Sequence, residues 1–440
     1  MKVSRYTFLF SHENRFYIYN TLSNTLMEVD EGYYKILELS QRQKTAIIND
    51  LDKELMGVLT DKRFIVENET DEFLLYKSII HGQRSQTEQM HLTLAPTMDC
   101  NFKCHYCFEK KEKTYMTSQV IDSIIKYVTS IKDLKKIHLT WFGGEPLMAT
   151  DQMEEFYSKF SKQWNREFSS NIITTAYHIT DKVIDILKSI KVEDMQITLD
   201  GNRDSHNKIK YSDDCEDVFS KVIRNIDLLV EKAPEIHITV RVNLTKENAH
   251  EYVSLYKLLT DRYRRRNLGV APAFVQDRGN DNWRSSKNIF FNQKESSTFV
   301  LNLYRKAGIH TPWMRYPERF INECAIRDQR AISFDPLGYA YKCWEIIGNK
   351  KYAVGKLEDG VIKNINQTML NRQLYGADPI EDKVCSKCSY LPLCNGGCPI
   401  HRIENEFEAG NIDTCVCYKG FLSDFMKIHL DLKRAGYDNY

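Results

Sequence analysis

The chain of 440 residues lacks several features that would place it in a large class of proteins. Lysine and arginine (61) nearly balance aspartate and glutamate (60), so the net charge of +1 gives no general attraction to nucleic acid or membrane surfaces. No apolar run reaches the roughly 18 residues that a membrane span needs. The first residues also lack an apolar segment of signal-peptide length. We therefore expect a cytoplasmic protein that binds neither nucleic acid nor membranes.

Cysteine is absent from the first 99 residues, yet the whole chain contains 12. Three of them lie within eight consecutive positions just after residue 99, and six lie between residues 385 and 417. Because a reducing compartment disfavours disulfides, cysteines clustered in this way indicate metal binding.

Residues 91–310 alternate short apolar strands with helices of about 10–16 residues. This alternation predicts an α/β fold, with a parallel sheet and the helices outside it. Six such units are fewer than the eight of a closed barrel, so we expect a partial (β/α)6 barrel. The predicted strands are 91–95, 136–142, 172–178, 194–199, 236–243 and 269–274, and the predicted helices are about 118–130, 151–163, 180–190, 216–231, 247–260 and 293–306.

Two further regions flank this predicted barrel. Residues 1–85 combine strands with two or three short helices and a final strand at 64–66, which predicts a winged-helix-like domain. Residues 311–440 lose regular periodicity where cysteine becomes dense, which is typical of a domain built around metal. We therefore predict three domains, over 1–85, 91–310 and 311–440, with a polar helical linker at 71–90.

The strongest local pattern is Cys100-x3-Cys104-x2-Cys107, which follows the predicted strand 91–95. Three cysteines at this spacing can ligate three irons of a 4Fe–4S cluster and leave the fourth iron open, as a catalytic cluster requires. The carboxyl end of a strand is also where βα sheets place their active sites. A structural zinc site is the competing interpretation, but it has no fourth ligand close by in the sequence.

This triad resembles the signature of the radical S-adenosylmethionine (SAM) enzymes, and Tyr106 fills the aromatic position before the last cysteine. The resemblance implies that SAM chelates the open iron and is cleaved to a 5′-deoxyadenosyl radical, which abstracts a substrate hydrogen. Gly143, Gly144 and Glu145 end the second predicted strand and resemble the family's GGEP motif, which contacts the SAM amino group. Glycine allows close backbone approach, and a carboxylate suits an ammonium group.

Three further residues occupy SAM-binding positions by the same resemblance. Thr198 matches the hydroxyl residue of the fourth strand, and Lys210 stands where relatives often carry an arginine. Lysine supplies the charge of arginine without its planar fork. Thr174 begins a Thr-Thr-Ala-Tyr segment where relatives often read Thr-Thr-Asn-Gly, so the contact of that asparagine is absent or replaced.

The C-terminal cysteines resemble a second signature, the SPASM extension, which houses two auxiliary 4Fe–4S clusters. Their order, Cys-x13-Gly-x4-Cys, a gap, Cys-x2-Cys-x5-Cys-x3-Cys, a gap and Cys-x-Cys, fits that of the extension. Two zinc ribbons are the competing interpretation. The resemblance implies that the first cluster is bound by Cys324, Cys343 and Cys398. It implies that the second is bound by Cys385, Cys388 and Cys394 together with a late cysteine. Cys415 and Cys417 either bind one cluster each, or one of them is idle and the first cluster keeps an open iron.

Three smaller features complete the motifs. Cys215 lies in an acidic loop and is interpreted as an incidental thiol. Sulfatase-maturing relatives place an aspartate base after the cysteine that corresponds to Cys343, where this chain has Trp344. Glu345, one step later, is the candidate catalytic base, with a surface or salt-bridged glutamate as the competing interpretation. The basic run 262–266 is interpreted as a solvated loop, with contact to an acidic peptide as the alternative.

Peptide maturases of this type often begin with a winged-helix element that binds a leader peptide by strand addition, and residues 1–85 have its length and order of elements. The resemblance therefore implies a maturase that modifies a ribosomally synthesised peptide, forming a thioether or carbon–carbon cross-link. Its expected cofactors are SAM and three 4Fe–4S clusters. Its expected partners are a precursor peptide with a leader and an external electron donor such as flavodoxin or ferredoxin. The alternatives are sulfatase-type oxidation of a residue in a partner protein, and a non-catalytic iron–sulfur or zinc protein.

Overall fold

The computed structural model describes residues 1–440 except 44–47, 49–50, 277–288, 311–323, 417 and 438–440. The chain forms two compact units, and each is described by itself. The terminal unit comprises residues 1–85, 293–324 and 376–440, and the barrel unit comprises residues 86–292 and 325–375. No helix in the described ranges combines the length and the apolar character needed to cross a bilayer.

The barrel unit is built on one sheet, in which the described strands have the order β11-β10-β9-β8-β7-β6-β12-β13-β14-β15. Strands β6 to β11 and β12 pair in parallel, whereas β12 to β15 form an antiparallel meander. The strands span β6 Gln89–Leu94, β7 Lys136–Trp141, β8 Glu167–Thr174, β9 Val192–Leu199, β10 His237–Leu244, β11 Leu268–Phe274, β12 Ala331–Phe334, β13 Tyr339–Tyr341, β14 Gly355–Glu358 and β15 Val361–Lys363.

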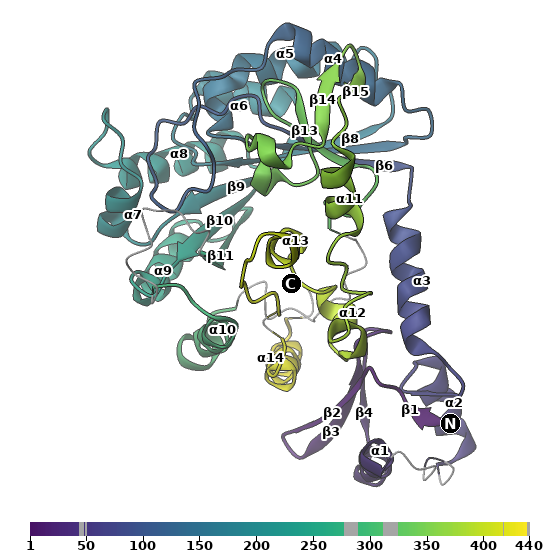
Figure 1. The fold of residues 1–440 in the computed structure, drawn as a ribbon. Coiled ribbons are helices and arrows are strands. Elements are labelled where there is room, and N and C mark those ends of the chain that lie inside the picture. Colours follow the sequence, from purple (N-terminus) through teal and green to yellow (C-terminus); the bar gives the residue numbers. More distant parts are fainter. Residues whose placement is uncertain (44–47, 49–50, 277–288, 311–323, 417, 438–440) are drawn as a thin grey trace. The chain divides into compact units, whose positions relative to one another are not determined.

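Helices connect the parallel strands, and α4, α5, α6 and α8 lie on the same face of the sheet (Figure 1). Threonine hydroxyls begin two of them, because Thr117 accepts from the Val120 N–H and Thr180 from the Val183 N–H. The helices of this unit span α4 Ser118–Thr129, α5 Thr150–Phe160, α6 Asp181–Ser189, α7 Arg203–Ile209, α8 Val218–Lys232, α9 Tyr252–Arg262 and α11 Gln367–Tyr375, and the short 3-10 turns span η2 Pro146–Ala149, η3 Ala249–Glu251, η6 Trp344–Ile346 and η7 Lys350–Tyr352.

The two faces of the parallel sheet differ in chemistry. Along β10 every second residue is a buried isoleucine, valine or leucine, and these alternate with half-buried polar residues. The same alternation occurs in β6 and β7. Since successive side chains of a strand point to opposite faces, one face forms the apolar core with the helices and the other is polar. The polar positions include His91, His138, Asn171, Gln196, Thr198, Arg241 and Asn243.

The α/β partial barrel with a parallel sheet is confirmed, and five of its six strands lie within two residues of the predicted bounds. The third strand was placed too late, because β8 begins at Glu167 and ends at Thr174 instead of covering 172–178. Most of its first residues are polar, including Glu167, Ser169 and Asn171, which hides them from an apolar pattern. The strand ends where Thr174 bonds to Glu145 and Ala176 adopts a φ of 56°.

The terminal unit begins with an antiparallel meander of order β2-β3-β4, in which β4 is an outer strand. A two-stranded sheet pairs β1 with β5. The elements of this unit span β1 Lys2–Val3, β2 Thr7–His12, β3 Arg15–Asn20, β4 Thr25–Val29, α1 Glu31–Gln43, α2 Lys53–Asp61, β5 Ile65–Val66, α3 Glu72–Arg84, α10 Gln293–Ala307, η8 Cys385–Lys387, α12 Leu391–Cys394, α13 Pro399–Phe407 and α14 Leu422–Arg434.

Residues 1–85 share hydrophobic cores with the cysteine-rich segment inside the terminal unit. Tyr17 and Tyr19 of β3 pack with Leu422 and Met426 of α14. A buried ion pair adds to this, since Arg84 at the end of α3 bonds both carboxylate oxygens of Asp378. The three-domain division at 1–85, 91–310 and 311–440 remains a prediction.

Candidate functional site

The loop after β6 carries Cys100, Cys104 and Cys107, all partly buried. The backbone turns at the end of the motif, where the Cys107 N–H donates to the Cys104 carbonyl at 3.1 Å. Burial raises the pKa of the Cys100 thiol to about 12 and that of Cys107 to about 11, and Cys104 is close enough to contribute to both shifts. Three partly buried thiols in one short loop fit a site for a metal, which would bind them as thiolates.

The glycine loop after β7 packs directly against the backbone of the cysteine loop. A Cβ atom at Gly143, whose φ is 116°, would lie 2.3 Å from the Thr97 carbonyl oxygen. A Cβ atom at Gly144 would lie 2.2 Å from the Asp99 carbonyl oxygen. Two backbone bonds join the loops, from the Gly144 N–H to Thr97 O (3.1 Å) and from the Glu145 N–H to Asp99 O (2.8 Å). The glycines are thus required for the contact between the two loops.

Glu145 is fully buried at the carboxyl ends of the strands. Its Oε1 accepts from the Thr174 hydroxyl and from the Leu147 N–H. Its Oε2 accepts from both the N–H (2.8 Å) and the hydroxyl (2.6 Å) of Thr175. Four donors therefore fix the orientation of a carboxylate that the sequence predicts to bind an ammonium group.

Tyr106 and Lys210 meet in a buried network next to the cysteine loop. The Tyr106 hydroxyl donates to Asp200 Oδ1 at 2.6 Å and accepts from Lys210 Nζ at 2.9 Å and Asn243 Nδ2 at 3.1 Å. Lys210 Nζ also lies 3.1 Å from Asp200 Oδ2 and 3.7 Å from Cys104 Sγ. The structure therefore brings both predicted SAM-binding residues to the cysteine triad, through an aspartate that the motif alone did not assign.

Charges in this network follow from burial and pairing. Burial lowers the pKa of Lys210, but the Asp200 carboxylate and the neighbouring Cys104 and Tyr106 outweigh it, so the pKa lies above its ordinary value. Burial, followed by Asp200, raises the pKa of Tyr106 well above its ordinary value. His206, from α7, has its pKa lowered to about 4 by burial, and its Nδ1 accepts from the Asp200 N–H at 3.2 Å. At neutral pH Lys210 is therefore an ammonium, Tyr106 a phenol and His206 a neutral imidazole.

Thr198 of β9 and Arg241 of β10 are register partners on the polar face of the sheet. Arg241 Nε donates to Asn243 Oδ1 at 3.2 Å. Burial lowers the pKa of Arg241, and the nearby Glu345 carboxylate opposes this shift. Glu345, the predicted catalytic base, therefore contributes to the charge balance of the polar face.

Trp344 has a packing role that explains its position next to Cys343. Its ring lies edge-on against Phe142, with 4.9 Å between the ring centroids and 86° between the planes. Phe142 directly precedes Gly143, so Trp344 supports the glycine loop.

Four cysteines of the terminal unit form a second set. Burial raises the pKa of Cys394 to about 12, and Cys388, Cys385 and Cys415 contribute to this shift as near neighbours. Cationic side chains also contact the set: Arg402 Nη1 lies 3.5 Å from Cys385 Sγ, and Lys419 Nζ lies 3.0 Å from Cys415 Sγ. A group of four thiols with adjacent cations fits a fully ligated, negatively charged cluster.

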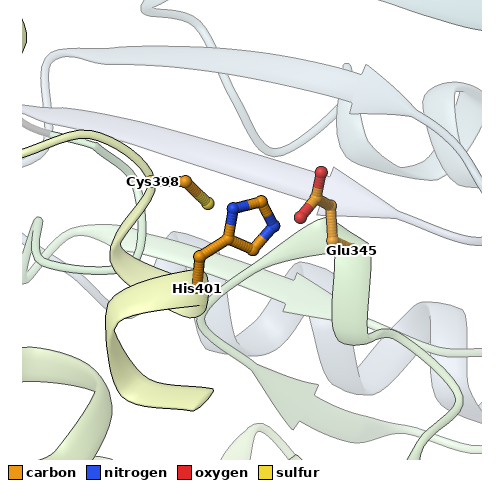
Figure 2. A group of neighbouring side chains, drawn as sticks. All are labelled: Glu345, Cys398 and His401. Atoms are coloured by element: carbon orange, nitrogen blue, oxygen red, sulfur yellow. The ribbon is translucent and has the colours of Figure 1, made fainter. Parts of the chain in front are cut away.

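The remaining predicted auxiliary ligands are divided between the units. Cys343 is buried in the barrel unit, whereas Cys324 and Cys398 belong to the terminal unit. Cys398 directly precedes α13, and His401 lies in the first turn of this helix (Figure 2). The predicted ligand Cys417 lies outside the described residues.

Sequence reasoning missed Asp200, Thr175, Arg241 and Asn243 as site residues. Asp200 and Thr175 stand beside residues that the motifs singled out, but only the fold shows that their side chains bond to Tyr106 and Glu145. The other two had a signal in the sequence. Arg241 and Asn243 occupy alternate polar positions near the carboxyl end of an otherwise apolar strand, which places them on the open face.

Comparison with known proteins agrees with this geometry. A family model described as the radical SAM superfamily matches residues 94–259. The radical SAM cyclopropyl synthase TigE of Paramaledivibacter caminithermalis is 22% identical over 91% of this chain and 89% of its own length. A cysteine-type anaerobic sulfatase-maturating enzyme of Clostridium novyi is 24% identical over 75% of this chain and 92% of its own length.

Two solved structures share the fold. Native anSMEcpe with bound AdoMet and Cp18Cys peptide aligns with a TM-score of 0.59 at 18% identity, over 80% of this chain and all of that one. Streptococcus suis SuiB aligns with a TM-score of 0.50 at 13% identity, over 94% of this chain and all of that one. The matched segment, residues 94–259, contains the cysteine loop, the glycine loop and the Asp200 network, and so the chain is a radical SAM enzyme of the SPASM type, related to the anaerobic sulfatase-maturating enzymes and TigE.

Proposed function

We propose that this enzyme modifies a ribosomally synthesised peptide by radical chemistry and forms a thioether or carbon–carbon cross-link. The observation that carries the proposal is the packing of the glycine loop on the cysteine loop, beside a polar sheet face, at the carboxyl ends of β6 and β7. The similarity to TigE over 91% of the chain supports a related type of substrate.

Each residue of the barrel site has a role under this proposal. Cys100, Cys104 and Cys107 would hold a 4Fe–4S cluster with an open iron, and Glu145 would bind the SAM ammonium in the orientation set by its hydroxyl and N–H donors. Thr198 would contact SAM from the polar face. A cluster and SAM held there would supply the radical chemistry, in which one electron cleaves SAM to methionine and a 5′-deoxyadenosyl radical.

The cross-link would form within the peptide in two steps. The peptide would lose one hydrogen atom to the deoxyadenosyl radical, which leaves a substrate radical. A second peptide group would bond to that radical and release a proton and one electron. The auxiliary cysteines would hold the clusters that accept this electron, with Cys385, Cys388, Cys394 and Cys415 as one ligand set. An external donor such as flavodoxin or ferredoxin would supply the electron for SAM cleavage.

The terminal unit supplies a candidate site for the leader of the precursor. Strand β4, over Thr25–Val29, has β3 on one side only within the described sheet. An extended peptide can pair with such an outer strand through its backbone, which gives affinity without restricting the sequence of the modified segment. The SuiB structure matches 94% of this chain, in agreement with a shared layout.

Co-expression in a bacterial host with the small open reading frame nearest to its own gene tests the proposal. We expect mass spectrometry of the recovered peptide to show the loss of two hydrogen atoms per cross-link. The same peptide recovered with a Cys100→Ala, Cys104→Ala, Cys107→Ala triple variant should keep its encoded mass. If the enzyme cleaves SAM but the co-expressed peptide keeps its encoded mass, the proposed reaction is contradicted.

Oxidation of a residue in a partner protein is the second candidate function. It is supported by the sulfatase-maturating relative of Clostridium novyi, which covers 75% of this chain. It is disfavoured by Trp344, which packs against Phe142 where those relatives place an aspartate base. Incubating the enzyme with a peptide from a sulfatase active site separates the two, because only the second function predicts oxidation of its cysteine or serine.

A further inference from the structure

Lys210 is a buried lysine that faces the cysteine loop. Its side chain is 5% exposed, and it follows α7 directly, so the end of this helix fixes its place. Its Nζ lies 3.7 Å from Cys104 Sγ, within hydrogen-bonding distance for sulfur. Together with Asp200 and Tyr106, Cys104 makes three partners for the ammonium group of Lys210.

The other two partners keep the ammonium group in place. Asp200, whose side chain is fully buried, lies 3.1 Å from Nζ and accepts from the Tyr106 hydroxyl at 2.6 Å. Tyr106 accepts from Lys210 at 2.9 Å. Removing Lys210 would leave a buried carboxylate without its counter-charge, so the three side chains act as one network.

An ammonium group next to a sulfur ligand of the cluster changes the reduction potential of that cluster. Hydrogen bonds and positive charge at the sulfur atoms stabilise the reduced, more negative form of an iron–sulfur cluster and raise its reduction potential. The effect is strong in a buried site, where little water screens the charge. Of the Asp200–Lys210 pair, the ammonium is the member that contacts the sulfur.

We propose that Lys210 is a positioning residue that sets the reduction potential of the catalytic cluster by donating a hydrogen bond to Cys104 Sγ, with Asp200 fixing the ammonium and offsetting its charge. This inference rests on the proposed function in one respect, that Cys104 is a cluster ligand. It assigns Lys210 to the cluster, in place of the SAM contact expected from the sequence.

The test is an EPR-monitored redox titration of the reconstituted full-length enzyme, following the signal that changes on addition of SAM. Lys210→Met should lower the midpoint potential, so that the ratio of reduced to oxidised cluster at a fixed potential falls about tenfold, or roughly 59 mV. Asp200→Asn should shift the potential in the opposite direction, because it leaves the ammonium without its offset. Lys210→Arg should keep the wild-type value.

Lys208→Met is the matched control, since Lys208 is an exposed lysine at the end of the same helix. It should leave the potential unchanged, and the dissociation constant for SAM should stay within about twofold in Lys210→Met. If Lys210→Met fails to fold, the double variant Lys210→Met/Asp200→Asn removes both charges of the pair, and Lys210→Arg and Asp200→Asn still report the sign of the effect.

Two results would overturn the inference. An unchanged potential in both Lys210→Met and Asp200→Asn would show that the pair does not act on the cluster. A Lys210→Met variant with an unchanged potential and greatly weakened SAM binding would return Lys210 to the SAM carboxylate. A Cys104→Ala variant separates this from the proposed function: a SAM-responsive signal that survives Cys104→Ala contradicts the ligand assignment itself.

Discussion

Under the proposed function, the SAM site depends most on the buried Glu145 carboxylate. Glu145→Gln keeps the shape of the side chain and removes its charge, so we expect the dissociation constant for SAM to rise about 10–100-fold, the value of one charged hydrogen bond. Anaerobic calorimetry with the reconstituted enzyme measures this. Glu154→Gln on the exposed side of α5 is the control and should bind SAM as the wild type does.

His206 makes stability depend on pH. Burial lowers its pKa to about 4 in the folded state, below the ordinary 6.5. The unfolded chain therefore takes up a proton first, and stability present above pH 6.5 is lost as the pH falls toward 4. Between pH 7.5 and 5.5 the free energy of unfolding should fall by about 1.4 kcal/mol from this group.

Chemical denaturation of His206→Gln and of a control tests that dependence. His206→Gln should lose this part of the pH dependence, whereas His81→Gln, at an exposed position of α3, should retain it. An equal decline in stability for the wild type and His206→Gln would show that other groups cause it.

Among elements, the glycine loop is the one whose backbone is most constrained. Gly143→Ala would place a Cβ atom 2.3 Å from the Thr97 carbonyl oxygen at a φ of 116°, so we expect a loss of about 1–3 kcal/mol in stability and fewer irons bound at the triad. Gly82→Ala in α3 meets no atom within 4 Å and should be neutral or stabilising. Full iron content in Gly143→Ala would contradict the contact between the loops.

Cys415 tests the second cysteine set. Since Cys394 has Cys385, Cys388 and Cys415 as neighbours, Cys415→Ser should remove the cluster bound there, lowering the iron content from about twelve to about eight per chain. Cys215→Ser should keep all the iron, because Cys215 stands apart from both cysteine sets in the sequence and belongs to neither motif. Unchanged iron and sulfide in Cys415→Ser would exclude Cys415 as a ligand.

The strands and helices of the barrel were predictable because the residue patterns that indicate them lie within single short segments of the sequence. Strand β10 alternates buried and polar residues with a period of two, and helices such as α8 repeat apolar residues at helical spacing. The polar start of β8 and the short helix α7 lacked such a signal. Motif spacing also identified the cysteine and glycine loops, but not the side chains that bond to them, because Asp200, Thr175 and Asn243 reach the site from different strands through the fold.

At the scale of the whole molecule, the N-terminal and cysteine-rich segments stabilise one another within the terminal unit. Arg84 and Asp378 are each 6% exposed and form an ion pair between them. Arg84→Met should destabilise the protein by about 3–5 kcal/mol, because it leaves the buried Asp378 carboxylate without its counter-charge, and Arg84→Met/Asp378→Leu should recover much of that loss. Denaturant unfolding measures both variants.

Lys126→Met, in the exposed pair of Lys126 with Asp359, is the control and should change stability little. If Arg84→Met unfolds no more easily than Lys126→Met, then the buried pair does not join the two segments energetically.

The central claim, that this chain is a radical SAM enzyme whose triad holds the catalytic cluster, has one direct measurement. The reconstituted protein is incubated anaerobically with SAM and a strong reductant, and 5′-deoxyadenosine is quantified together with iron and sulfide. We predict deoxyadenosine from the wild type at about twelve irons per chain, and none from the Cys100→Ala, Cys104→Ala, Cys107→Ala variant. A wild-type protein that holds its iron but releases no deoxyadenosine, or a triple variant that still releases it, would contradict the account.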